Sequence, residues 1–286
     1  MKKVLAMLLA AGMIFSMTAC GAKTEAPAEE KKETVEENTE AVEENVEGTE
    51  EMDGAMVLIS EGKLVMATNA QFPPYELVSD GEGVDGTGFE GIDIEIAMVL
   101  AEKLGLELQI DDMDFDAALM AVQEGKCDVV LAGLTYTEER DQIMDFSDSY
   151  AQGVQVIIVN EDSAIKSVDD LANADQIGTQ RGTTGYIYCC DDYGDDHVAA
   201  YDNGASAVQA LKNGQVDAVV IDKAPALEYV GANEGLVILD TEYVVEDYCV
   251  AMAEGNRGLQ AAINVALNEL IEDGTVDAII EKYIKA

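Results

Sequence analysis

Short apolar runs alternate with amphipathic stretches from about residue 63 to the end of the chain. Apolar runs rich in β-branched residues predict buried strands, and apolar positions three and four apart predict helices with one buried face. We expect strands at residues 64–69, 106–110, 128–133, 153–159, 176–180, 217–221 and 236–240. Helices are expected at residues 94–105, 115–125, 168–174, 206–214, 259–274 and 276–284. Asp93 is expected to cap the first helix and Gly105 to end it. This alternation predicts an α/β protein with largely parallel sheets.

Two segments of the chain share one plan. Residues 125–133 (GKCDVVLAG) and 214–222 (GQVDAVVID) each have a helix-ending glycine, an aspartate three residues later and an apolar strand. When the glycines are superposed, Gly133 coincides with Asp222. Ligands of open α/β sheets bind outside the carboxyl ends of the strands, so the two units could face each other across a cleft. The alternative is that any two buried βα units look alike.

Polar and aromatic residues follow several predicted strands and together suit an amino-acid zwitterion. Arg140 has the fork geometry to bind a carboxylate with two parallel hydrogen bonds. Asp222 has the charge to neutralise an ammonium group, helped by the Thr135 hydroxyl. Residues 182–185 (GTTG) could supply backbone N–H groups at a helix N-terminus, and aromatic side chains could sandwich the ligand side chain. The aromatic candidates are Phe72 and Phe115.

Each of these candidates also has a plainer explanation. Arg140 stands among acidic neighbours and could pair with them at the surface, and Asp222 could simply cap the next helix. Phe72 and Phe115 could belong to the core, and Arg181 fits either a ligand contact or a local acid. No nucleophile–base pair is evident, because the only histidine lies far from these loops in the pattern. The pattern therefore favours binding over catalysis.

Length and charge narrow the class of protein. A chain of 286 residues exceeds one typical domain, so two lobes are expected. The formal net charge of −42 argues against nucleic acid as a partner, since phosphates require a basic face. It fits a secreted or surface protein that self-repulsion keeps soluble, and we expect a monomer.

The N-terminal segment has the features of an export signal. Lys2 and Lys3 precede an apolar run at residues 4–17, which is too short to span a bilayer as a helix. Thr18-Ala19-Cys20 resembles the lipobox of bacterial lipoproteins, which implies removal of residues 1–19 and a lipid on Cys20. The alternative is plain secretion. Residues 20–55 are rich in acids and poor in large apolar side chains, so we expect a solvated linker.

Four further cysteines are expected to be free thiols: Cys127, Cys189, Cys190 and Cys249. Residues 189–197 (CCDDYGDDH) contain metal-ligand types but lack the spacing of calcium loops or zinc sites. We interpret this segment as a solvated acidic turn and predict neither a metal nor a cofactor.

Four motifs together resemble the amino-acid-binding solute receptors of family 3, components of ABC importers. They are GIDIEIAMVLA (residues 91–101), AGLTYTEERDQIMDFSDSY (132–150), GTTG (182–185) and NVALNELIEDGTVDAIIEKYI (264–284). The resemblance spans about residues 63–285. It implies an α/β, two-lobed, type II periplasmic-binding-protein-like fold with the ligand in the cleft between lobes.

The lobes are assigned along the chain as follows. Lobe 1 is expected at residues 56–152 and 247–286, and lobe 2 at residues 153–246. The chain would cross near residues 151–155 and 246–250, and hinge closure would trap the ligand for a membrane permease. The expected location is the outer face of the cell membrane, through the lipid on Cys20.

The resemblance also assigns ligand-binding roles. Arg140 would hold the ligand carboxylate and Asp222 its ammonium group. Gln180 stands where some relatives discriminate between side chains, and Ala132 replaces a frequent serine. The full predicted set is Asn69, Phe72, Phe115, Gly133, Thr135, Arg140, Gln180, Thr183 and Asp222.

The ligand class rests on Asn69, where family members often have aspartate. A neutral amide leaves a cationic side chain without a counter-charge, and burial of an unpaired charge is unfavourable. We therefore expect a polar, uncharged L-amino acid, with the reach of Glu76 and Arg181 left open. The alternatives are an enzyme like cyclohexadienyl dehydratase, which has the same fold, and the sensor module of a signalling receptor.

Overall fold

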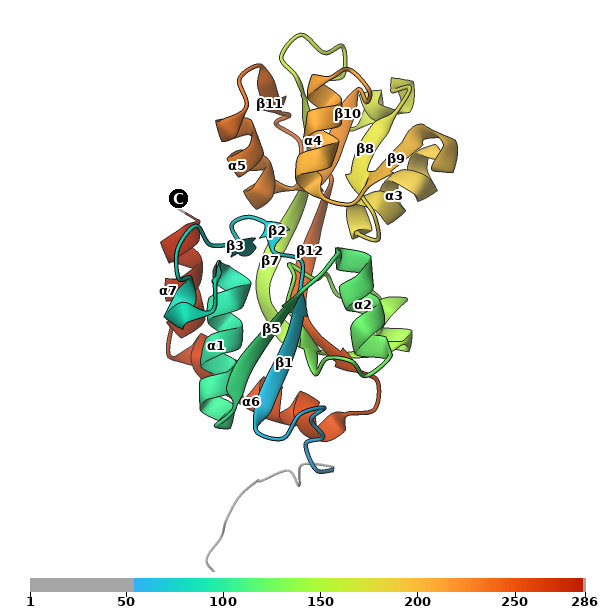
Figure 1. Ribbon diagram of the computed structural model, residues 1–286. Coiled ribbons are helices and arrows are strands. Elements are labelled where there is room, and N and C mark those ends of the chain that lie inside the picture. Colours follow the sequence, from blue (N-terminus) through green and yellow to red (C-terminus); the bar gives the residue numbers. More distant parts are fainter. Residues whose placement is uncertain (1–53, 285–286) are drawn as a thin grey trace, which may run out of the picture. The chain divides into compact units, whose positions relative to one another are not determined.

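The computed structural model of the protein describes residues 54–284 (Figure 1). The predicted signal segment, the lipidation site Cys20 and the linker as far as residue 53 lie outside the described residues. Within residues 54–284, no helix is both long and apolar enough to cross a membrane.

One sheet of nine strands organises residues 54–284, in the order β5-β1-β6-β12-β7-β10-β8-β9, with β11 paired to β7. Pairing is parallel within β5-β1-β6 and within β10-β8-β9, as predicted. It is antiparallel where β12 and β7 meet each other and their neighbours, so the expectation of largely parallel sheets is wrong for the centre. The strands are β1 (Lys63–Thr68), β5 (Glu107–Asp112), β6 (Val129–Val130), β7 (Met144–Asn160), β8 (Ile177–Gln180), β9 (Val198–Tyr201), β10 (Ala218–Asp222), β11 (Leu236–Ile238) and β12 (Val244–Ala253).

The helices form two groups around this sheet (Figure 1). Lobe 1 denotes β1, β5 and β6 with helices α1 (Ile92–Leu104), α2 (Phe115–Gln123), α6 (Arg257–Glu272) and α7 (Thr275–Tyr283). A small sheet of β2 (Gln71–Phe72), β3 (Glu76–Val78) and β4 (Phe89–Glu90) belongs to lobe 1. Lobe 2 denotes β8 to β11 with α3 (Thr184–Tyr193), α4 (Gly204–Lys212) and α5 (Lys223–Ala232).

Strands β7 and β12 pass through both lobes and pair along most of their length. The register runs from Gln155 opposite Val244 to Met144 opposite Ala253. The predicted crossing positions lie in this paired stretch, and the exact lobe boundaries stay a prediction. β7 begins well before the predicted strand 153–159, in a stretch where exposed polar residues such as Asp148 interrupt the apolar pattern. β12 was not among the predicted strands.

Other elements also differ from expectation. The predicted helix at 168–174 is a 3-10 helix at Asp169–Asn173. Of helices α3 and α5 only the N-terminal ends were anticipated, at residues 182–185 and after Asp222. Part of the acidic segment 189–197 lies in α3 rather than in a turn, and Asp195–His197 forms a 3-10 helix. Two more 3-10 helices lie at Val84–Gly86 and Arg140–Gln142. The four predicted free thiols are free, and three of them are buried.

The two similar βα segments have the same internal construction. The Asp128 carboxylate accepts a hydrogen bond from the Val65 N–H at 2.8 Å, and the Asp217 carboxylate accepts one from the Gln176 N–H at 3.1 Å. Asp128 stands just before β6 and is hydrogen-bonded to the neighbouring strand β1. Asp217 stands just before β10 and is hydrogen-bonded to the residue that precedes the neighbouring strand β8. The equivalence therefore extends to hydrogen bonding, and it places Gly133 just beyond β6 and Asp222 at the end of β10.

Candidate functional site

One cavity brings together all nine residues predicted from the sequence. The space within it, counted together with the open solvent at its mouth, is about 320 Å³. Lobe 1 and the Arg140 loop supply one wall, and the ends of β8 and β10 with the start of α3 supply the other. The lining residues are Asn69, Phe72, Glu76, Phe115, Ala132, Gly133, Thr135, Arg140, Gln180, Thr183, Thr184 and Asp222.

Arg140 is a buried cation, only 7% exposed. Its Nη1 donates to the Thr135 carbonyl at 2.6 Å and its Nη2 to the Gly182 carbonyl at 3.0 Å. Its Cζ lies 5.8 Å from the centre of the Phe115 ring. Burial lowers the pKa of Arg140 to about 10, although Glu246 acts to raise it, so the group stays charged at neutral pH. No carboxylate within residues 54–284 forms an ion pair with it. A buried guanidinium in this state suits an incoming anion.

Asp222 is the buried carboxylate of the cavity. Its Oδ2 accepts from Gln155 Nε2 at 2.8 Å, and its Oδ1 accepts from the Tyr248 hydroxyl. It stands at the N-cap position of α5 without making a side-chain cap hydrogen bond, so capping does not account for the carboxylate. Burial raises the pKa of Asp222 to about 7, with the Tyr248 hydrogen bond opposing and Glu246 adding to the rise. A nearby cation would restore its ionised form.

The N-terminus of α3 contributes hydroxyl and amide groups. The Thr183 hydroxyl donates to the Gln180 carbonyl at 2.8 Å and accepts from the Tyr186 N–H at 3.3 Å, which caps the helix. Amides in the first turn of a helix have no intrahelical acceptor. Those of Thr184 and Gly185 therefore favour negative charge nearby, as expected for the GTTG segment.

Asn69 and Gln180 meet each other across the cavity. Gln180 Nε2 donates to Asn69 Oδ1 at 3.0 Å, and Asn69 Nδ2 donates to the Met113 carbonyl at 3.0 Å. Both side chains are buried. This pair links the two lobes, and it leaves the Gln180 oxygen as an acceptor.

Glu76 lines the cavity although the sequence left its reach open. It is fully buried, and neither carboxylate oxygen has a hydrogen-bond partner within residues 54–284. Burial raises the pKa of Glu76 well above its usual range, and the Asp93 carboxyl adds to the rise. The one signal that the sequence offered is an acidic residue that follows Phe72 and Tyr75 and stands at the first position of β3.

Asp93 supports the cavity from behind and does not cap α1 as predicted, since Gly91 occupies the N-cap. The fully buried Asp93 carboxylate accepts from the Gly133 N–H at 2.8 Å and from the Tyr150 hydroxyl at 2.8–2.9 Å. Burial raises the pKa of Asp93 to about 6 against these hydrogen bonds. Gly133 has φ +53, and a Cβ there would lie 2.7 Å from the Phe72 ring. The site needs glycine at this place, and Asp93 positions it.

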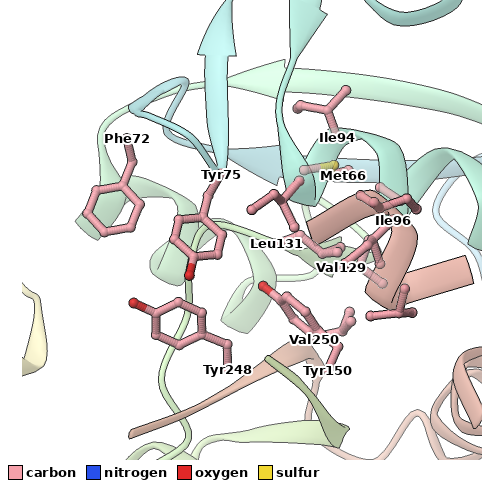
Figure 2. Close-up of a cluster of buried hydrophobic side chains, with 14 of the residues drawn as sticks. Met66, Phe72, Tyr75, Ile94, Ile96, Val129, Leu131, Tyr150, Tyr248 and Val250 are labelled. Atoms are coloured by element: carbon pink, nitrogen blue, oxygen red, sulfur yellow. The ribbon is translucent and has the colours of Figure 1, made fainter. Parts of the chain in front are cut away.

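Aromatic rings connect the cavity to the core (Figure 2). Phe72 stacks on Tyr75 at 5.7 Å between ring centres, and Tyr75 meets Tyr248 edge-on at 5.2 Å. In Figure 2, Tyr75 lies between Phe72 and the aliphatic side chains around Leu131. Phe72 and Phe115 are both buried and line the cavity, so the core and pocket interpretations hold together.

One candidate is placed elsewhere, and no metal site is found. Arg181 forms an ion pair with Asp202 at 3.6 Å and does not line the cavity. In the part of the chain that the structure describes, no group of His, Cys, Asp or Glu is arranged to hold a metal ion.

Comparison with known proteins gives consistent matches. The profile of the bacterial extracellular solute-binding proteins, family 3, matches residues 64–286. A probable histidine-binding protein of Neisseria gonorrhoeae is 30% identical over 81% of this chain and 87% of its own. An ABC transporter glutamine-binding protein of Bacillus subtilis is 28% identical over 100% of this chain and 98% of its own. The solved structure of an ancestral arginine-binding protein bound to arginine is 41% identical, with a TM-score of 0.71 over 78% of this chain and 98% of its own.

Proposed function

Because the chain belongs to the bacterial extracellular solute-binding proteins, family 3, we propose that it binds an L-amino acid between its lobes for an ABC importer. The observation that carries this proposal is the pairing of opposite charges in one cavity. Arg140 is buried without an ion-pair partner in the described residues, and Asp222 is a buried carboxylate on the other lobe. Only a ligand with both an anion and a cation satisfies the two at once.

The preferred side chain follows from Glu76. The sequence favoured a neutral polar ligand because no counter-charge for a cation could be assigned to the pocket. Glu76 supplies one, since its unpartnered carboxyl lines the cavity. We therefore propose an amino acid with a cationic side chain, arginine foremost. The Gln180 oxygen adds an acceptor that a guanidinium group can use.

Delivery is the second part of the proposal. β7 and β12 are the paired strands about which the lobes would close, as in other hinge-bending binding proteins. A permease would receive the closed form, and the lipid on Cys20 would keep the protein on the outer face of the membrane. These statements rest on the sequence signals and on the naming of relatives as ABC transporter components.

The enzyme alternative has one observation in its favour. Glu76, with its raised pKa, is a possible general acid in the cavity. The presence of both Arg140 and Asp222 in the cavity favours an amino acid over the dicarboxylate-like substrate of a dehydratase. We therefore propose binding without catalysis.

A ligand screen tests the function. Binding to the folded state alone raises the unfolding temperature, so each of the twenty amino acids is added in a thermal-shift assay and the hits are titrated by calorimetry. Arginine is expected to bind most tightly. Glu76→Gln should weaken arginine by roughly 30-fold, since a buried charge pair is lost, and change glutamine affinity little. If glutamine remained tighter than arginine in the unmodified protein, the cationic proposal would fail while amino-acid binding would stand.

The pH dependence sharpens the same test. The raised pKa of Glu76 means that the empty cavity favours its protonated form, whereas a bound cation favours the ionised form. Arginine binding should therefore release a proton, and its affinity should rise with pH until the empty-state pKa is passed. Asp222 meets the ammonium group of every amino acid, so glutamine reports its contribution alone. The difference in slope between arginine and glutamine should vanish in Glu76→Gln.

A further inference from the structure

Two side chains of lobe 2 reach lobe 1 outside the cavity. Asn203 Nδ2 donates to Gln71 Oε1 at 2.9 Å, and the Tyr229 hydroxyl donates to the Gln71 carbonyl at 3.1 Å. None of these three residues lines the cavity. They connect β2 in lobe 1 with the start of α4 and with α5 in lobe 2.

The local structure of α4 fixes both donors. Asn203 is the N-cap, and its Oδ1 accepts from the Ser206 N–H at 2.8 Å, which orients the amide so that Nδ2 points away from the helix. Gly204 follows, and a Cβ there would lie 3.1 Å from the Tyr229 ring and 2.5 Å from Ile221 Cδ1. Glycine therefore leaves room for the tyrosine ring against the start of the helix. The two donors are held in place before they meet lobe 1.

Their target directly precedes a ligand-facing residue. Gln71 is exposed, its N–H donates to the Asn69 carbonyl at 2.6 Å, and the next residue is Phe72. Asn69 and Phe72 both line the cavity. Hydrogen bonds to Gln71 therefore fix the position of residues 69–72, which form one side of the cavity.

We propose that Gln71, Asn203 and Tyr229 form an interlobe latch that keeps the lobes closed over a bound amino acid and sets how long it stays. The inference rests on the proposed function. Because the latch lies outside the cavity, it acts on the opening of the lobes and not on the choice of ligand. Its loss should shorten the residence of every amino acid by the same factor, with the association rate nearly unchanged.

Three variants each remove one of the groups that form the latch. Tyr229→Phe removes one hydroxyl, Gln71→Ala removes an exposed side chain, and Asn203→Ser keeps an N-cap oxygen but is too short to reach Gln71. Stopped-flow displacement of arginine and of glutamine should show dissociation about two- to tenfold faster in each, the effect of one hydrogen bond. Gln71→Ala combined with Asn203→Ser should be no worse than either alone, since both remove the same contact.

Matched substitutions within lobe 2 provide the controls. The Tyr243 hydroxyl donates a hydrogen bond to Asp192, and Asn213 stands at the C-terminal cap of α4. The variants Tyr243→Phe and Asn213→Ser should release the ligand at the same rate as the unmodified protein. The proposal is overturned if the latch variants match these controls, or if arginine and glutamine change by different factors.

A ligand-free measurement separates the latch from the proposed function. Amide hydrogen exchange of the full chain without ligand should be faster in the latch variants for residues 69–75 and 181–186, because the closed arrangement is less populated. This result is expected even if no amino acid binds. Unchanged exchange in all three variants would overturn the latch and leave amino-acid binding untouched.

Discussion

The βα segment of lobe 1 that ends at Gly133 and its counterpart in lobe 2 that ends at Asp222 are built alike but end in different chemistry. Both have a positive-φ glycine after a helix, at Gly125 and Gly214, and an aspartate that holds a neighbouring strand. In lobe 1 the strand is followed by Gly133, which offers only backbone groups to the cavity. The Asp93 carboxylate does not line the cavity and accepts a hydrogen bond from the Gly133 N–H. Lobe 2 presents a carboxylate directly.

The buried carboxylate therefore has a different role in each lobe: in lobe 1 it positions a loop, and in lobe 2 it faces the cavity. Where the strand end is a glycine, the Asp93 carboxylate is used to position a loop, and Arg140 further along the chain supplies the charge that faces the cavity. Where the strand end is Asp222, its own support comes from the neutral donors Gln155 and Tyr248. The same framework therefore carries a negative group at the strand end in lobe 2, whereas in lobe 1 the positive group, Arg140, comes from the loop that follows the strand.

The largest expected effect comes from neutralising the lobe 2 end. Asp222→Asn keeps the size of the side chain but removes the charge that would meet the ammonium group. Amino-acid affinity should fall by about 2–5 kcal/mol, as when one member of a buried charge pair is lost. Calorimetry measures this, with Asp217→Asn in the same segment as control. An affinity within threefold of the unmodified protein would remove Asp222 from the site.

Arg140→Lys tests the complementary charge. Lysine keeps the positive charge but loses the planar fork, so affinity should weaken by about 1.5–3 kcal/mol. Arg181→Lys, at an exposed ion pair outside the cavity, should have no effect on binding. Equal affinities for the two Arg140 forms in calorimetry would show that no carboxylate is gripped there.

Gly133→Ala tests why lobe 1 ends in glycine. The new methyl group would crowd the Phe72 ring, and overpacking of this kind costs about 1–3 kcal/mol. Part of that cost should appear as weaker ligand binding, since Phe72 lines the cavity. Gly214→Ala also has a positive φ but faces open space, so it should lower stability slightly and leave affinity unchanged. Identical binding by both variants would contradict the steric explanation.

The smallest effect compares the two supporting aspartates. Both aspartates accept a second backbone hydrogen bond, Asp128 from the Ile59 N–H and Asp217 from the Asp175 N–H, but Asp128 is only 3% exposed whereas Asp217 is exposed. Asp128→Asn should lower the free energy of unfolding by about 1 kcal/mol, the value of one hydrogen bond, and Asp217→Asn by less. Urea denaturation gives both values. A larger loss in Asp217→Asn would mean that burial does not distinguish the two units.

Sequence reasoning predicted the residues of the candidate site that follow apolar runs. Arg140 and Asp222 were recognisable because a charged residue just after a buried strand has few structural reasons to be there. Asp93 was mistaken for a helix cap because its acidic type suits both roles, and only the approach of Gly133 from a distant segment distinguishes them. Glu76 could not be assigned because burial of its carboxyl depends on residues far away in the sequence.

The fold shows the same limit. The parallel strands β1, β5, β6, β8 and β10 were predicted from short apolar runs, whereas the edge strand β9 (Val198–Tyr201) was not predicted. Of the two long central strands, β7 was predicted only in part and β12 not at all, because their burial changes along the way from buried to exposed and back. The periodicity of such a strand reflects two environments, so no single pattern describes it.

The β7–β12 ladder has register shifts between Tyr248 and Cys249 and again between Cys249 and Ala251. Such irregularities bend and twist a paired strand locally while the flanking pairs are kept. We therefore predict that the proposed closure of the lobes bends this pair of strands mainly at residues 248–251. A reporter group attached beside residues 248–251 should therefore change its distances to neighbouring residues when the lobes close. A reporter among the regular pairs at Val244 or Ala253 should keep nearly the same distances to its neighbours.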